Sequence, residues 1–205
     1  VVFRPNAAVR RLTSADHLVA RTAVDQFRIL IKKESYKFSA THFTVFGPDQ
    51  AERLHGHNYA VSVECGLTQT DELGMAFEFN SLKPFIKKTA DLWDEFVLIP
   101  TANPYIKIAD EKIAGTPHII VNYADKSYRF PEADVRKLDV RNITSEELAK
   151  TFLELLLKSW LGSLAASERK ALESRLSWVE VAIEETRGQL AAIRRSFKPT
   201  SEKTP

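Results

Sequence analysis

The chain has a single cysteine, Cys65, among its 205 residues. One thiol cannot form an internal disulfide framework, which fits a reducing compartment, and we therefore expect a cytoplasmic protein. Lysine and arginine (29) nearly balance aspartate and glutamate (27), and no Lys/Arg stripe with interleaved aromatic residues occurs, so we expect no nucleic-acid partner. No apolar run reaches the length of a membrane span and no signal-peptide pattern opens the chain, so we expect no membrane association.

What the sequence does contain is the composition of a globular domain, with 44% hydrophobic and 27% charged residues. This length is sufficient for one substantial hydrophobic core and does not demand two domains. We expect an N-terminal extension over residues 1–26, one domain over residues 27–197 and a polar tail over residues 198–205. Within the extension, Thr13-Ser14-Ala15-Asp16 has the composition of a helix start.

The expected fold class is α+β. Alternating apolar and polar residues predict strands over 27–45 and 56–67, joined by turn residues 46–50. A cap at Asn80 or Ser81 predicts a helix to about Trp93, and the capping-box spacing of Thr144-Ser145-Glu146-Glu147 predicts another to about Trp160. Further expected elements are a hairpin over 118–123 and 126–130, a helical segment over 165–176, a strand over 178–186 and a short helix over 188–197.

Three histidines are placed so that they can converge. His55 and His57 lie two apart in a strand-like segment, and side chains at this spacing point to one face. His42 ends its own alternating run, so pairing the two strands brings three imidazoles together. This is the donor set of a catalytic zinc site whose fourth position is open. The alternative for each histidine is an ordinary strand residue satisfied by hydrogen bonds.

Cys65 is an even number of positions from His55 and His57, so in a strand it would face the same side, but it lies eight residues beyond His57. At about 3.3 Å per residue that is roughly 26 Å along a strand, too far to serve the same centre. We therefore expect Cys65 to be a small buried hydrophobic residue.

In the last expected strand, Val179, Val181, Ile183 and Glu185 share one face. A carboxylate that continues an apolar row costs several kcal/mol unless something donates hydrogen bonds to it. Either a local partner satisfies Glu185, or this carboxylate accepts hydrogen bonds from a ligand with N–H donors.

Taken in order, several motifs resemble the 6-pyruvoyl-tetrahydropterin synthase family, which includes the 6-carboxy-tetrahydropterin synthases. The resemblance covers roughly residues 27–195, and its most specific element is His55-Gly56-His57-Asn58-Tyr59. The other matching segments are Phe38-Ser39-Ala40-Thr41-His42, Met75 to Lys83, Thr144 to Ala149 and Ile183-Glu184-Glu185-Thr186.

The resemblance implies a T-fold, an antiparallel four-stranded sheet with two main helices on one face. It implies homo-oligomers, namely hexamers built from two trimers, with active sites between subunits. It also implies zinc held by His42, His55 and His57, a pterin ring anchored by Glu185, and pterin contacts near Thr144 and Ser145.

The departures from the family pattern concern catalysis. The position of the family's catalytic cysteine is Ala51, and Glu52 follows it, as in type III members, where a glutamate replaces the cysteine. The family's second catalytic segment carries an Asp-His pair, and the matching residues here are Asp94 and Glu95. A third departure is Glu78-Phe79 in place of Asp-Phe.

Three hypotheses follow from these matches and departures. The first is a zinc-dependent lyase that converts 7,8-dihydroneopterin (tri)phosphate to 6-hydroxymethyl-7,8-dihydropterin, a folate-type precursor, with Glu52 as general base and Asp94 and Glu95 in catalysis. The second is a 6-pyruvoyl- or 6-carboxy-tetrahydropterin synthase that uses another base. The third is a zinc- and pterin-binding relative with little catalysis.

Overall fold

A computed structural model describes residues 26–197, so the expected helix start near Thr13 and the polar tail lie outside the described residues. The strands are β1 (Phe27–His42), β2 (His55–Leu67), β3 (Phe96–Pro100), β4 (Lys107–Ile113), β5 (Thr116–Tyr123), β6 (Lys126–Pro131), β7 (Val135–Leu138), β8 (Leu176–Thr186) and β9 (Gln189–Ser196). The helices are α2 (Lys83–Asp91), α3 (Ser145–Ser163) and α4 (Ala166–Glu173), with 3-10 turns at Phe79–Ser81 and Glu132–Asp134.

The main sheet has the strand order β7-β3-β1-β2-β8-β9. Its four strands β1, β2, β8 and β9 are antiparallel neighbours, which confirms the expected four-stranded sheet. Beyond them, β3 pairs with β1 and β7 pairs with β3, both in parallel. These two additions were not predicted because strands of five and four residues are too short to show an alternation.

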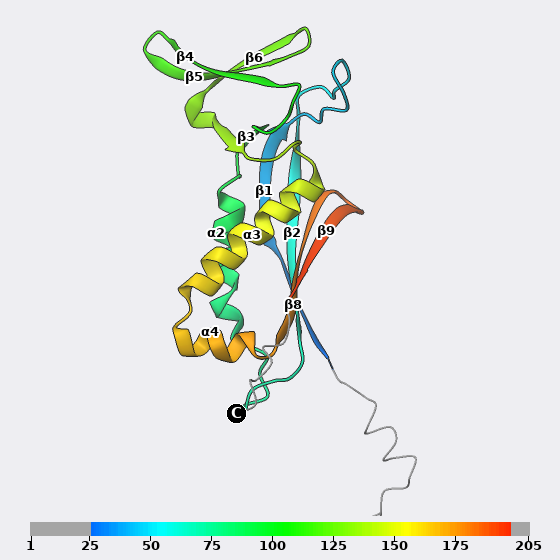
Figure 1. The fold of residues 1–205 in the computed structure, drawn as a ribbon, viewed down its shortest axis with the longest axis vertical. Helices are drawn as coiled ribbons and strands as arrows, with labels where there is room; N and C mark the ends of the chain where they lie inside the picture. Colours follow the sequence, from blue (N-terminus) through cyan, green and yellow to red (C-terminus); the bar gives the residue numbers. More distant parts are fainter. Residues whose placement is uncertain (1–25, 198–205) are drawn as a thin grey trace, which may run out of the picture.

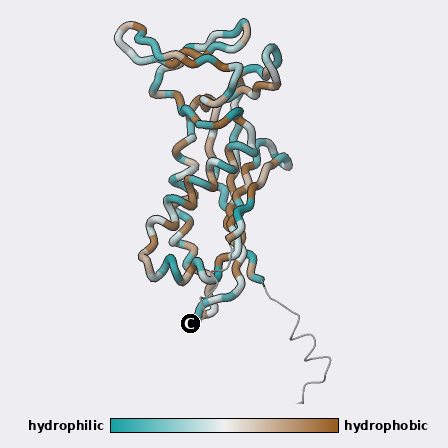
Figure 2. The backbone as a smooth tube through the Cα atoms, viewed as in Figure 1, coloured by the Kyte–Doolittle hydropathy of each residue, from teal (hydrophilic) through white to brown (hydrophobic). Residues whose placement is uncertain are grey.

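Two helices, α2 and α3, cover one face of this sheet (Figure 1), as expected for the fold class. Hydrophobic and hydrophilic residues are intermixed along the helices and strands (Figure 2), and the buried hydrophobic ones form the core. The core between the layers holds large, fully buried side chains such as Tyr59, Phe152 and Trp160. Burial of each such side chain contributes about 1.5–3 kcal/mol.

A separate three-stranded sheet, β4-β5-β6, lies at one end of the molecule (Figure 1). It has its own hydrophobic cluster, in which Ile119, Val121 and Tyr123 pack with Phe43, the residue after β1. The predicted hairpin is confirmed as β5 and β6, while β4 was missed because most of its residues are exposed. This small sheet therefore packs on the connection between β1 and β2.

One prediction was wrong: the segment expected to be a short helix over residues 188–197 contains strand β9 (Gln189–Ser196). Gly188, at φ 86, makes the tight turn that returns the chain alongside β8. The register then places Arg194 opposite Glu180, and their side chains form an ion pair at 2.9 Å. Pairing with β8 outweighs the local helical tendency of the segment, because it also packs Ile193 against the main core.

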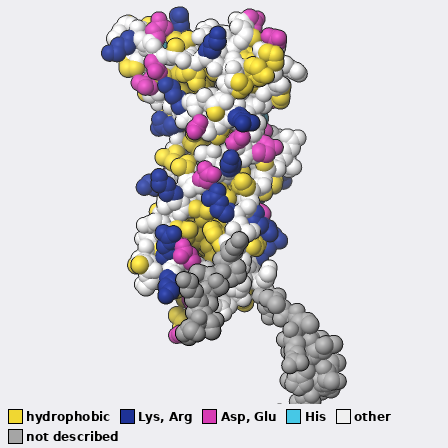
Figure 3. All heavy atoms as spheres, viewed as in Figure 1, with side chains coloured by type: hydrophobic (Ala, Val, Ile, Leu, Met, Phe, Trp, Pro, Cys, Tyr) yellow, Lys and Arg dark blue, Asp and Glu magenta, His cyan; other side chains and the backbone are white. Residues whose placement is uncertain are grey.

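The remaining boundaries differ by a few residues. Strand β1 ends at His42 rather than residue 45, since Val45 forms only an isolated bridge with Ala51. The helix predicted from Asn80 or Ser81 begins at Lys83, with Pro84 in its first turn. No helix in the described range is long and apolar enough to cross a membrane. On the face drawn in Figure 3, basic and acidic side chains are interspersed.

Candidate metal centre and adjoining cavity

The pairing of β1 with β2 brings the three histidines together. His42 stands directly opposite His55, and His57 stands opposite Ala40, two residues before His42. One ring nitrogen from each histidine lies within 4.8 Å of the others. His42 and His55 have ring centroids 4.8 Å apart, and those of His55 and His57 are 4.7 Å apart. The predicted convergence of the three imidazoles is therefore present in the fold.

Backbone carbonyls orient two of these rings. His42 Nδ1 lies 3.0 Å from the carbonyl oxygen of Ile143, and His55 Nδ1 lies 2.7 Å from that of Arg53. Because a carbonyl oxygen only accepts, each Nδ1 carries the proton and each Nε2 keeps a free lone pair. Burial lowers the pKa of His42, which favours the neutral imidazole that binds metals.

The centre has more acceptors than protons. The Tyr59 hydroxyl lies 2.9 Å from Glu185 Oε1 and 3.0 Å from His42 Nε2, and it has one proton to donate. Glu185 Oε1 also lies 3.4 Å from His42 Nε2 and 3.7 Å from His57 Nε2. Converging lone pairs of this kind are stabilised by a cation. Three neutral imidazoles beside a carboxylate are a donor set that can hold a metal ion.

Tyr59 was not among the candidate residues predicted from the sequence. Its parity with His55 and His57 was a signal, since it is the next residue along the same face of β2. The side chain is fully buried, and burial together with the Glu185 carboxylate raises the pKa of Tyr59. The hydroxyl therefore keeps its proton as a hydrogen-bond donor.

Glu52 lies on the connection between β1 and β2, three residues before His55, and its side chain is hydrogen-bonded to Thr44, two residues after His42. Its carboxylate Oε2 accepts a hydrogen bond from the Thr44 backbone N–H at 2.9 Å, and its own N–H donates to Thr44 O at 2.9 Å. Lys126, at the start of β6, donates to the Glu52 carbonyl oxygen at 3.3 Å.

Two opposing effects set the pKa of Glu52. Burial raises it, but the hydrogen bonds from Thr44, together with positive charge on His55 and His42 when these rings are protonated, lower it by more in total. The pKa therefore lies below its ordinary value, and Glu52 is ionised at neutral pH. The hydrogen bond from the Thr44 backbone holds this carboxylate in place.

The three residues predicted to contact substrate share one cavity of about 260 Å³. Glu185, Thr144 and Ser145 line it, together with Thr44, Glu146, Gln189, Leu190 and Ala191. Thr144 is the N-cap of α3, and its side chain accepts a hydrogen bond from the Glu147 N–H at 3.4 Å. Because Glu185 lines this cavity and also contacts His42, the cavity adjoins the histidine centre.

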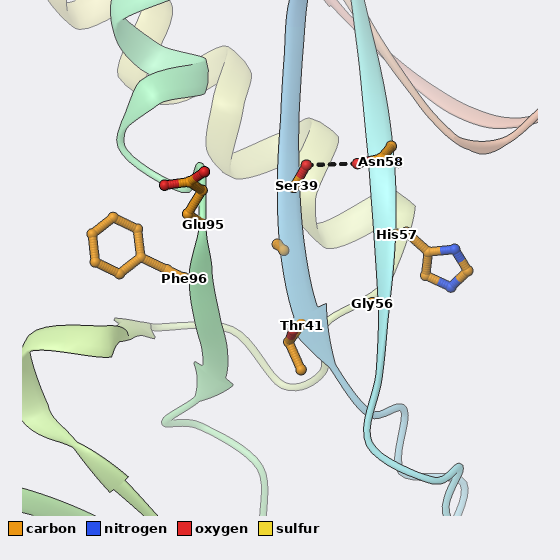
Figure 4. Close-up of a pocket in the computed structure, with 8 residues that line it drawn as sticks. Ser39, Thr41, Gly56, His57, Asn58, Glu95 and Phe96 are labelled. Atoms are coloured by element: carbon orange, nitrogen blue, oxygen red, sulfur yellow. Dashed lines mark hydrogen bonds between the residues drawn. The ribbon is translucent and has the colours of Figure 1, made fainter.

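In the described part of the chain, no hydrogen bond or ion pair joins Asp94 or Glu95 to the three histidines. Asp94 Oδ1 accepts from Ser39 N at 2.8 Å, and Glu95 N donates to Ser39 O at 2.7 Å, so both are attached to the backbone of β1. Glu95 has φ 64, an uncommon conformation for a residue other than glycine. Glu95 lines a second cavity together with Ser39, Thr41, Asn58 and His57, although the His57 ring points away from it (Figure 4).

Cys65 is fully buried between its strand partners Ile29 and Val179, as expected for a small hydrophobic residue. Burial raises the pKa of its thiol to about 12. A thiol in this state is protonated and a poor nucleophile. The chain therefore has no reactive thiol near the histidines.

Comparison with known proteins gives a consistent result. A family model described as 6-pyruvoyl tetrahydropterin synthase matches residues 30–196. A candidate 6-carboxy-5,6,7,8-tetrahydropterin synthase of Methanocaldococcus jannaschii is 27% identical over 161 residues, which covers 78% of this chain and 90% of the relative. The 6-carboxy-5,6,7,8-tetrahydropterin synthase of Rickettsia conorii is 33% identical over 55 residues, or 27% of this chain and 40% of that protein.

Solved structures share the fold. The 6-pyruvoyl tetrahydropterin synthase of Plasmodium falciparum superposes with a TM-score of 0.74 at 24% identity, covering 84% of this chain and 99% of the other. The Plasmodium vivax protein of the same name gives a TM-score of 0.73 at 22% identity, with the same coverage. At these identities the structural likeness establishes the T-fold.

Proposed function

The chain belongs to the 6-pyruvoyl tetrahydropterin synthase family, and we propose that it is a zinc-dependent lyase acting on the side chain of 7,8-dihydroneopterin triphosphate. The proposed product is 6-hydroxymethyl-7,8-dihydropterin. The observation that carries this choice is the carboxylate of Glu52 beside the histidine centre, in a chain whose one thiol is buried elsewhere. A carboxylate can serve as a general base but offers no sulfur chemistry.

Zinc is the metal that best suits three neutral imidazoles with an open position. Held by His42, His55 and His57, it would polarise the hydroxyl groups of the substrate side chain as a Lewis acid. The chain itself supplies the orientation of these rings, through the carbonyl groups of Ile143 and Arg53.

The ring of the substrate would occupy the cavity of about 260 Å³ next to the centre. There the Glu185 carboxylate would accept hydrogen bonds from the pterin N–H groups, and the start of α3 at Thr144 and Ser145 would line the opposite wall. This arrangement supports the interpretation of Glu185 as a ligand anchor, since a dihydropterin has adjacent N–H donors.

Glu52 would take the proton of the second side-chain hydroxyl group. The bond between the first two side-chain carbons then breaks, its electron pair passes into the pterin ring, and a proton returns to the first carbon. The leaving fragment carries the new carbonyl group and the triphosphate. The hydrogen bond from Thr44 holds the base in place.

A relative supports a glutamate in this role. Two structures of the Plasmodium vivax 6-pyruvoyltetrahydropterin synthase carry substitutions of a glutamate described as its catalytic residue. That family member therefore uses a carboxylate, and we propose the same use for Glu52 here.

The second candidate function is a 6-carboxy-tetrahydropterin synthase, favoured by the names of the relatives from Methanocaldococcus jannaschii and Rickettsia conorii. The two functions differ in product. We therefore propose incubating zinc-loaded protein with 7,8-dihydroneopterin triphosphate and identifying products by mass spectrometry, with metal-free protein as control. A 6-hydroxymethyl product supports the lyase, a 6-carboxy or 6-pyruvoyl product supports a synthase, and binding without turnover supports a pterin-binding relative.

We also propose a cytoplasmic homo-oligomer, a hexamer of two trimers, from the family resemblance. In such an assembly, Asp94 and Glu95 would serve the centre of a neighbouring copy. The cavity that Glu95 lines is one from which the His57 ring of the same chain points away (Figure 4). Native mass spectrometry tests the assembly. A monomer with full activity would contradict a role for these two residues in a shared site.

A further inference from the structure

The Tyr59 side chain links the histidine centre to the carboxylate of Glu185. Its ring stacks on Phe38 with centroids 4.8 Å apart and an interplanar angle of 18°. This stacking holds the hydroxyl where it donates to Glu185 Oε1 at 2.9 Å and lies 3.0 Å from His42 Nε2. The three side chains come from β2, β8 and β1, so the contact spans three adjacent strands.

Glu185 needs such a partner because of where it lies. The register between β8 and β9 shifts between Glu184 and Thr186, so the backbone around Glu185 is outside regular pairing. Its side chain is 27% exposed and faces the cavity. Among the described residues, Tyr59 is the hydrogen-bond donor to this carboxylate. Without it, a side chain with three rotatable bonds would sample several orientations.

We propose that Tyr59 is a positioning residue, whose hydroxyl fixes the Glu185 carboxylate in the orientation that receives the N–H donors of the pterin ring. Tyr59 is fully buried and does not line the cavity, so it acts on substrate only through Glu185. This inference rests on the proposed function, in which Glu185 anchors the pterin.

The test is Tyr59→Phe, which keeps the stacked ring and removes only the hydroxyl. The matched control is Tyr36→Phe, since Tyr36 is also a buried strand tyrosine but lies on β1 away from the cavity. For each protein we would measure zinc content, melting temperature and the affinity for 7,8-dihydroneopterin from its fluorescence.

Tyr59→Phe should bind 7,8-dihydroneopterin about 10-fold to 100-fold more weakly, as expected for losing a hydrogen bond to a charged group. Zinc content should stay at the wild-type level, and KM should rise by a similar factor with kcat changed far less. Tyr36→Phe should bind the pterin as the wild type does. Unchanged affinity in Tyr59→Phe would overturn the proposal. So would loss of zinc together with pterin, because the hydroxyl would then serve the metal ligand His42.

A double substitution separates this inference from the proposed function. If Tyr59 acts through Glu185, the variant Tyr59→Phe/Glu185→Gln should bind the pterin no more weakly than Glu185→Gln alone. Additive losses would overturn the positioning role. If wild-type protein binds no pterin, or Glu185→Gln binds it normally, the proposed function itself fails. If Glu185→Gln weakens binding and Tyr59→Phe does not, only the role of Tyr59 fails.

Discussion

Replacing Glu52 with glutamine removes the proposed base while preserving its shape. The amide keeps a carbonyl oxygen that can accept from the Thr44 N–H, now 2.9 Å from Oε2. The backbone bond from Glu52 N to Thr44 O does not involve the side chain and should persist. We therefore expect the loop between β1 and β2 to keep its position, so that a loss of activity reports on the carboxylate.

The effect on stability should be small and dependent on pH. A hydrogen bond to a charged acceptor is worth about 1 kcal/mol more than a neutral one, which sets the size of the loss in metal-free protein. Because folding lowers the pKa of Glu52, its stabilisation is present above the ordinary value of 4.5 and is lost as pH falls through the folded pKa. The difference in unfolding free energy between wild type and variant should therefore shrink in acid.

The effect on activity should be much larger. Loss of a general base typically costs a factor of about 10² to 10⁴ in rate, and glutamine cannot take a proton. Zinc content should not change, since the three imidazole ligands remain. The assay measures turnover of 7,8-dihydroneopterin triphosphate by mass spectrometry, zinc by elemental analysis, and unfolding free energy by urea titration at pH 7 and pH 4.

The control is Glu72→Gln, which removes one charge from an exposed loop. It should keep wild-type turnover. If Glu52→Gln retains turnover within a few fold of wild type, with zinc bound, Glu52 is not the base. If zinc is lost with activity, the carboxylate supports the metal centre and the assignment of a proton-transfer role is wrong.

Three further outcomes are expected. Glu95→Gly should raise the unfolding free energy by about 0.5–1 kcal/mol, because glycine adopts φ 64 without strain. If Glu95 is catalytic, this stabilised variant should also turn over substrate more slowly than the wild type. Full turnover would refute a catalytic role for Glu95. Gly66→Ala should cost about 1–3 kcal/mol, since its Cβ would lie 2.1 Å from Trp178 Nε1. The control is Gly162→Ala in α3, where the added Cβ would have no atom within 4 Å, so this variant should be as stable as the wild type or more stable. Equal melting temperatures for the two alanine variants would contradict this packing argument. The Cys65 thiol, with its pKa raised to about 12, should resist iodoacetamide at pH 8 until urea unfolds the protein, and rapid labelling of native protein would refute its burial.

Local patterns in the sequence were sufficient to predict which side several residues of the histidine centre face. Alternation put His55 and His57 on one face and aligned Glu185 with the buried row of β8, and both placements are found in the fold. The capping residues at Thr144 also predicted the start of α3. These predictions were correct because side-chain direction in a strand and capping at a helix end depend on residues only a few positions apart.

Only the tertiary structure decided the features that depend on distant partners. Strand β9 forms by pairing with β8. The short strands β3 and β7 form because β3 pairs in parallel with β1 and β7 pairs in parallel with β3. The same holds within the site, where the Tyr59 hydroxyl meets a carboxylate 126 positions away, at Glu185. The sequence alone determined which residue types face the centre. The pairing of strands distant in sequence decided which of them touch, because such contacts depend on register and packing that no local pattern encodes.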